Sequence, residues 1–181
     1  MPERTQQLPE QVELTGLLTF VETVDAELLP VEKWLLSVAR DPRQAGWEWR
    51  EGGLTFLRCG PLFTAIRFPA HLVRAAARSS EPAVVDAYLA EVLDGGPVIG
   101  ANGLTCYYAL VPPSASLRWK HPDVECLAWG TWLGVPPIRQ TDHGSPEGYW
   151  VVPMSGPGDL CNVDAVEAVR QRGHERLGEE S

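Results

Sequence analysis

Residues 62–68 read LFTAIRF, a run of aromatic, β-branched and small side chains that is typical of a buried β-strand. A shorter run of the same kind, LTFL at residues 54–57, precedes it, and the turn-forming residues Cys59-Gly60-Pro61 separate the two. Two such runs joined by a short turn predict a β-hairpin. Pro69 then ends the second strand and begins a helix.

Helices and strands follow one another outward from this hairpin in an order that predicts the α+β class. Apolar residues at three- and four-residue steps, with Pro, Ser and Gly at their ends, predict helices over 14–29, 30–40, 42–50, 69–78, 82–92 and 163–177. Short β-forming runs between turn residues predict strands over 98–100, 104–111, 124–128, 131–135 and 149–152. We expect a small, mostly antiparallel sheet packed on helices, with a helical N-terminal segment and a C-terminal helix.

The length and composition indicate one folded domain. With 181 residues, of which 44% are hydrophobic, the chain can bury a single core. Residues 1–10 are rich in Gln, Glu, Pro and Arg, and the chain ends in the charged stretch RLGEES. We therefore expect flexible tails over 1–10 and 173–181, with a single α+β domain over 11–172.

The charge of the chain limits its partners. It has 24 acidic and 15 basic residues, a formal net charge of −9, so its average surface repels phosphate backbones and strong nonspecific nucleic-acid binding is not expected. No apolar run approaches the roughly 20 residues of a membrane span, and residues 1–10 lack the pattern of a signal peptide. We expect a cytoplasmic protein that does not bind membranes.

Cysteine and histidine spacing does not indicate a metal site. No two of the four cysteines form a CxxC pair, and the four histidines form no HxxxH or HExxH pattern. Cysteines among apolar neighbours behave as small buried side chains, and this is the expectation here. The cysteines are Cys59, Cys106, Cys126 and Cys161.

Asp123 and Glu125 are the pair of carboxylates that could support metal-dependent chemistry. Side chains at i and i+2 of a strand point to one face, where both could bind the same Mg²⁺ or Mn²⁺ ion. The pair follows His121-Pro122, a turn pattern, so a solvated pair of acids is the other interpretation.

Arg118-Trp119-Lys120-His121 is the cluster in which basic residues flank an aromatic one. If Trp119 is exposed, it could stack on a planar ligand while Arg118, Lys120 and His121 contact anionic groups. If it is buried, it anchors the core and its neighbours are solvated.

Several segments have the same order, and the same placement of Gly, Pro and aromatic residues, as in a known family. They are GPVI at 96–99, YYALVPP at 107–113, VECL at 124–127, GTWLGVP at 130–136 and YWVVP at 149–153. With Trp119 they resemble a group of short actinobacterial proteins that look like degenerate relatives of the bifunctional DNA primase/polymerase N-terminal domain, the Prim-Pol family. The resemblance covers residues 54–169 and implies an RRM-like antiparallel sheet packed on helices.

The resemblance also bears on catalysis. In active Prim-Pol members, an Asp-x-Asp pair on a strand and a later histidine hold the metal ions and the nucleotide. The resemblance places Thr64 and Ile66 at the two aspartate positions, and neither provides the hard oxygen ligands that Mg²⁺ requires. It therefore implies that no metal is held and that polymerase chemistry is absent. Arg67, beside the former metal position, becomes a candidate phosphate contact.

Three functions stay open at this point. The first is a catalytically silent Prim-Pol-like binding or regulatory module that contacts a protein partner or a nucleotide and needs no cofactor. The second is an active metal-dependent nucleotidyltransferase that uses Asp123 and Glu125 with Mg²⁺ or Mn²⁺. The third is a protein-interaction partner with an exposed Trp-rich patch. None of these patterns predicts the oligomeric state.

Overall fold

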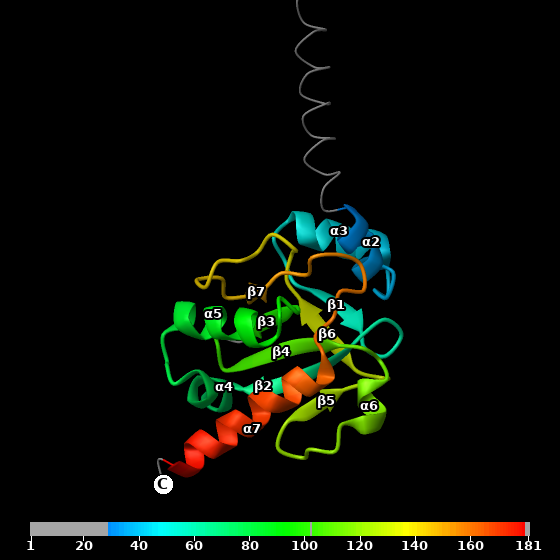
Figure 1. Ribbon diagram of the computed structural model, residues 1–181. Helices are drawn as coiled ribbons and strands as arrows, with labels where there is room; N and C mark the ends of the chain where they lie inside the picture. The colour runs from blue at the N-terminus through cyan, green and yellow to red at the C-terminus, as the bar shows by residue number, and fades with distance from the viewer. Residues whose placement is uncertain (1–28, 102, 180–181) are drawn as a thin grey trace, which may run out of the picture.

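The computed structural model describes residues 29–101 and 103–179, which form a central sheet with covering layers on both faces (Figure 1). The tail expected over 1–10 lies outside the described residues. So does the helix expected over 14–29, apart from Leu29, with which helix α2 begins. None of the described helices is long and apolar enough to cross a membrane.

The central sheet has five antiparallel strands in the order β5-β2-β4-β3-β7. Their bounds are Thr64–Pro69 for β2, Val98–Ala101 for β3, Cys106–Val111 for β4, Glu125–Leu127 for β5 and Tyr149–Val152 for β7. Strands β2 to β5 follow the split β-α-β arrangement. β2 and β3 run parallel to each other with the antiparallel β4 between them, and β4 and β5 run parallel with β2 between them. The α+β class and the antiparallel sheet packed on helices are therefore confirmed.

One face of the sheet is covered by helices. They are α4 (Ala70–Ala77), α5 (Pro82–Val92), the short α6 (Ala115–Arg118) and α7 (Val163–Glu179). Ile66 and Phe68 of β2 point into this layer, where they belong to one buried cluster with Leu72 of α4 and Val166 of α7. Because α4 and α7 both lie on this face, they pack against each other.

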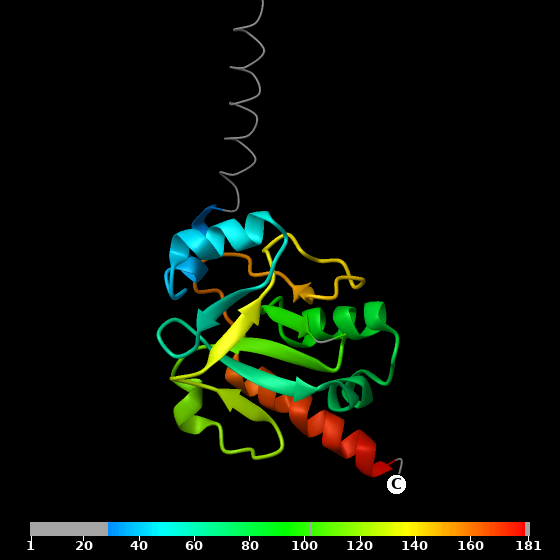
Figure 2. The ribbon, with the colours of Figure 1, turned by 180° about the vertical axis from the view of Figure 1, so that it is seen from behind.

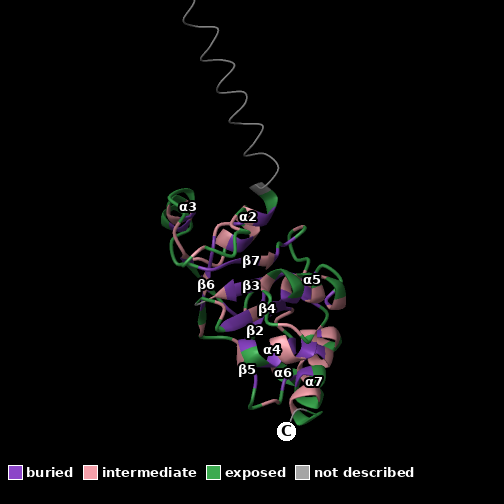
Figure 3. Ribbon diagram, turned by 90° about the vertical axis from the view of Figure 1, so that its left-hand side faces the viewer, coloured by how far each residue is buried: buried purple, intermediate pink, exposed green. Residues whose placement is uncertain are grey.

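The opposite face is covered by a second layer. It contains α2 (Leu29–Leu36), α3 (Pro42–Arg50) and a two-stranded sheet of β1 (Thr55–Arg58) and β6 (Trp132–Val135). The two-stranded sheet is in front in Figure 2. Leu57, Leu133, Ala65 and Trp150 are buried together between this layer and the central sheet. Figure 3 shows the buried strands β2, β3 and β4 between the two layers.

The hairpin expected from residues 54–57 and 62–68 does not form. β1 pairs with β6, with Leu57 opposite Leu133, while β2 pairs with β4 and β5 of the central sheet. Gly60 adopts a φ of 110° and its N–H donates to the carbonyl of Phe63 at 2.7 Å, so the turn takes the chain from one sheet to the other. The prediction was wrong because β1 finds its apolar partner 76 positions further along the chain.

Helix α7 continues to Glu179, through most of the stretch expected as a tail from residue 173. Gly173 is buried where α7 crosses α4: a Cβ atom there would lie 2.6 Å from the backbone oxygen of Leu72. The absence of a side chain therefore lets the two helices approach, and this packing holds the end of α7 on the domain.

Candidate functional site

The positions that the Prim-Pol resemblance assigns to metal-binding aspartates lie in the core. Thr64 and Ile66 are fully buried on the helix-covered face of β2, and the Thr64 hydroxyl has no hydrogen-bond partner among the described residues. Arg67 points to the other face, half-exposed, with its Nη1 3.4 Å from Oε2 of Glu125. Strand alternation thus separates Arg67 from the two positions it was expected to adjoin.

The carboxylates of Asp123 and Glu125 do not converge on one face. Asp123 lies before β5 and accepts hydrogen bonds from Arg170 Nε at 2.9 Å and Nη2 at 3.0 Å, with His174 Nε2 at 2.7 Å. The Arg170 guanidinium holds the pKa of Asp123 well below its usual range. Glu125 faces Arg67 on the opposite side of the sheet, so the expectation of a shared strand face was wrong.

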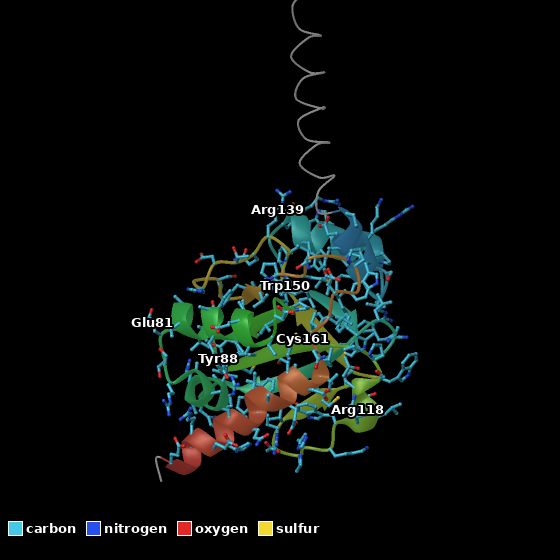
Figure 4. The ribbon with its side chains drawn as sticks, viewed as in Figure 1. Glu81, Tyr88, Arg118, Arg139, Trp150 and Cys161 are labelled. Atoms are coloured by element: carbon cyan, nitrogen blue, oxygen red, sulfur yellow. The ribbon has the colours of Figure 1, made fainter. Side chains whose placement is uncertain are left out.

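Residues of the Arg118–His121 cluster contact other residues of the same fold. Trp119 is buried and its Nε1 donates to the carbonyl of Val124 at 2.8 Å. Arg118, at the end of α6 (Figure 4), pairs with Asp164 at 3.1 Å, and His121 Nε2 lies 2.8 Å from Oε2 of Glu167. These contacts dock the segment onto α7; Lys120 is exposed. The core-anchor interpretation of Trp119 is confirmed.

The described residues contain no group of three His, Cys, Asp or Glu side chains placed to hold a metal ion. Asp86, His143 and Tyr149 do form a hydrogen-bonded group. The Asp86 carboxylate accepts from the Tyr149 hydroxyl at 3.0 Å and lies 2.6 Å from His143 Nε2. Burial raises the pKa of Asp86, and burial beside Asp86 raises the pKa of Tyr149. This group fastens the loop before β7 to α5.

A pocket of about 700 Å³ opens between the ends of α4 and α7. Figure 1 shows these two helix ends at its lower left. Basic and hydroxyl side chains form most of its wall, beside the apolar Ala75 and Leu177. The basic and hydroxyl lining residues are His71, Arg74, Arg78, Ser79, Ser80 and Arg176. None of them was singled out by the sequence patterns, and they come from segments about 100 positions apart.

Each arginine is placed by a helix end. Arg74 lies in the last turn of α4, where its Nη2 donates to the carbonyl of Leu104 at 3.1 Å. Arg176 lies in the last turn of α7, and cations at both places also stabilise the helix dipole. Arg78 lies just beyond α4 with a φ of 55°, in the left-handed region that favours glycine. Arg78 therefore occupies a position that glycine would adopt with less strain.

The described lining of the pocket has more basic than acidic residues, although the whole chain carries a formal net charge of −9. Among the described residues, its three arginines face one acidic lining residue, Glu179, whose Oε2 lies 3.2 Å from Arg176 Nη1 and 3.9 Å from Arg78 Nη2. Guanidinium groups donate paired hydrogen bonds that match the oxygens of phosphates and carboxylates. The pocket therefore has the chemistry of an anion-binding site.

No family model, no curated protein and no solved structure matches the chain.

Proposed function

We propose that the protein is a binding module that holds a phosphate-bearing small molecule in the pocket between α4 and α7. The convergence of Arg74, Arg78 and Arg176 on one cavity carries this proposal. Three guanidinium groups supply the charge that a phosphate needs without a metal ion. Ala75 and Leu177 offer apolar surface to the remainder of the ligand, so a nucleotide is a fitting class.

The proposal treats the chain as catalytically silent, in keeping with its Prim-Pol resemblance. The burial of Thr64 and Ile66 and the separate partners of Asp123 and Glu125 favour it over a metal-dependent nucleotidyltransferase. We place the module in the cytoplasm, because its four free cysteines suit a reducing compartment.

The test is a thermal-shift titration with inorganic phosphate, pyrophosphate and ATP, each measured once in EDTA and once with added Mn²⁺. A ligand at 100 times its Kd raises the free energy of unfolding by about 2.7 kcal/mol, which is readily measured. We expect stabilisation of the wild type and of Arg172→Gln, a matched control on the exposed side of α7, and a weaker response of Arg176→Gln. A response that requires Mn²⁺, or one that Arg176→Gln retains in full, contradicts the proposal.

A second candidate function is protein interaction through the outer surface of β1 and β6. Phe56 is 61% exposed, Trp132 is 39% exposed, and Trp129 in the preceding turn is 73% exposed. The Arg58 guanidinium lies 5.2 Å from the Trp132 ring centre, and exposed aromatic and arginine side chains are typical of binding surfaces.

Affinity capture from the native host tests this second function. We expect a partner that the wild type retains to be lost when Trp129 and Trp132 are replaced by alanine. Leu117→Ala is the control, because Leu117 is 78% exposed but lies on α6, in the layer that covers the other face of the sheet. Equal capture by both variants excludes the aromatic surface.

A further inference from the structure

In the part of the chain that the structure describes, the lining of the basic pocket includes one carboxylate. Glu179 is the last residue of α7, and its Oε2 contacts guanidinium groups from two segments: Arg176 of α7 at 3.2 Å and Arg78 beyond α4 at 3.9 Å. A phosphate bound in the pocket would use the same two donors. The carboxylate therefore occupies the place of a ligand oxygen.

The contacts of Glu179 are weak enough to be exchanged. The side chains of Glu179 and Arg78 are 64% and 66% exposed, and exposed ion pairs stabilise little because water screens them. The residue also belongs to the last turn of a helix, where opening costs less free energy than in the middle. A phosphate with two negative charges interacts more strongly with the same arginines than a single carboxylate does.

We propose that Glu179 is an internal competitor that regulates the pocket by occupying Arg78 and Arg176 until a phosphate-bearing ligand displaces it. This inference rests on the proposed function. The end of α7 then sets the ligand affinity: removing the carboxylate strengthens binding, although it removes a pocket-lining residue.

The experiment measures the Kd for inorganic phosphate by calorimetry, in EDTA, for the full chain and the variants Glu179→Gln and Glu179→Lys. Loss of the competing carboxylate is expected to tighten binding by about two- to fivefold in the glutamine variant, and further in the lysine variant. Glu175→Gln and Glu175→Lys are the controls: Glu175 lies one turn earlier on α7, hydrogen-bonded to Gln171 and outside the pocket. These control variants make the same changes of charge on α7 but outside the pocket.

Each outcome is decisive. Tighter binding by the Glu179 variants than by the matched Glu175 variants supports the competitor. If the wild type binds phosphate and the Glu179 variants bind no more tightly than their controls, the competitor is excluded and the pocket stands. If no protein binds phosphate, Glu179→Lys included, both the competitor and the proposed function are excluded.

Discussion

Helix α7 carries two groups of charged residues that are built differently. In its middle, Arg170 and His174 contact Asp123, and Arg170 also contacts Glu167, which in turn lies beside His121. At its end, Arg176 shares a pocket with Arg74 and Arg78, and Glu179 is the acidic residue among the described lining residues. In the first group Arg170 has two acidic partners, Asp123 and Glu167, whereas the described residues of the second group include three arginines and one acid.

The difference follows from what each group packs against. The middle of α7 faces the segment before β5, which supplies Asp123, and the resulting ion pairs dock that segment to the helix. The end of α7 faces the end of α4, which supplies more arginines. The cations in the middle of α7 have acidic partners within the fold, so we infer that they stabilise the folded state. Cations that lack enough acidic partners attract an anion from solution, so we assign them to binding.

The largest expected effect comes from Gly173, which holds the two helices close enough to form the pocket. Gly173→Ala adds a methyl group 2.6 Å from the Leu72 carbonyl oxygen. We expect a loss of about 1 to 3 kcal/mol in the free energy of unfolding, measured by urea denaturation, because the clash outweighs the better helix propensity of alanine. Phosphate affinity should fall as well, since α7 must move away from α4.

Gly178→Ala is the control for this substitution. Gly178 is in the same helix, and a Cβ atom there has no neighbour within 4 Å among the described residues. Helix propensity alone then acts, so stability should stay constant or rise. If Gly173→Ala also proves stabilising, the close approach of α4 and α7 is refuted.

The next effect separates the two charged groups directly. Arg170→Gln leaves Asp123 without its main partner and is expected to cost about 1 to 2 kcal/mol of stability while phosphate affinity is kept. Arg176→Gln should do the reverse, with affinity about tenfold lower and stability nearly unchanged. Urea denaturation measures the stability of each variant, and calorimetry measures its Kd for phosphate. If both variants lose stability and affinity to a similar extent, the two groups do not have separate roles.

Acid should weaken the middle group in a way that depends on Asp123. Because the folded-state pKa of Asp123 is depressed, its contribution is fully present above the unfolded value near 3.8 and is lost as the pH falls below it. The stability difference between the wild type and Asp123→Asn should therefore be largest near pH 7 and shrink toward pH 3, as followed by urea denaturation.

Asp86 provides the opposite case for the same experiment. Its folded-state pKa is raised by burial, so its contribution is present below pH 3.8 and is lost as the pH rises through the higher folded value. Relative to the wild type, the free energy of unfolding of Asp86→Asn should therefore be higher at pH 7 than at pH 3. A parallel pH dependence for both aspartates would contradict the assigned causes.

Local patterns predicted most elements but not their partners. Strand β2 and helices α4 and α5 lie where apolar spacing and the prolines at 69 and 82 indicated. The β1 hairpin failed because pairing with β6 is a nonlocal choice. The pocket was missed for a related reason. Arg74 and Arg176 each resemble ordinary cations at a helix end, and the packing of α4 against α7 brings them together.

The smallest expected effect concerns Arg67, the phosphate contact suggested by the Prim-Pol resemblance. Arg67 is 47% exposed and pairs with Glu125 at 3.4 Å, an exposed pair of the kind that contributes at most about 1 kcal/mol. It lies on the side of the sheet away from α4 and α7, so Arg67→Ala should leave the Kd for inorganic phosphate unchanged. A loss of affinity comparable to that of Arg176→Gln would move the binding site to the β2 and β5 strands. In that case the arginines at the ends of α4 and α7 would be stabilising the helix ends, and the resemblance would be the better guide to the ligand.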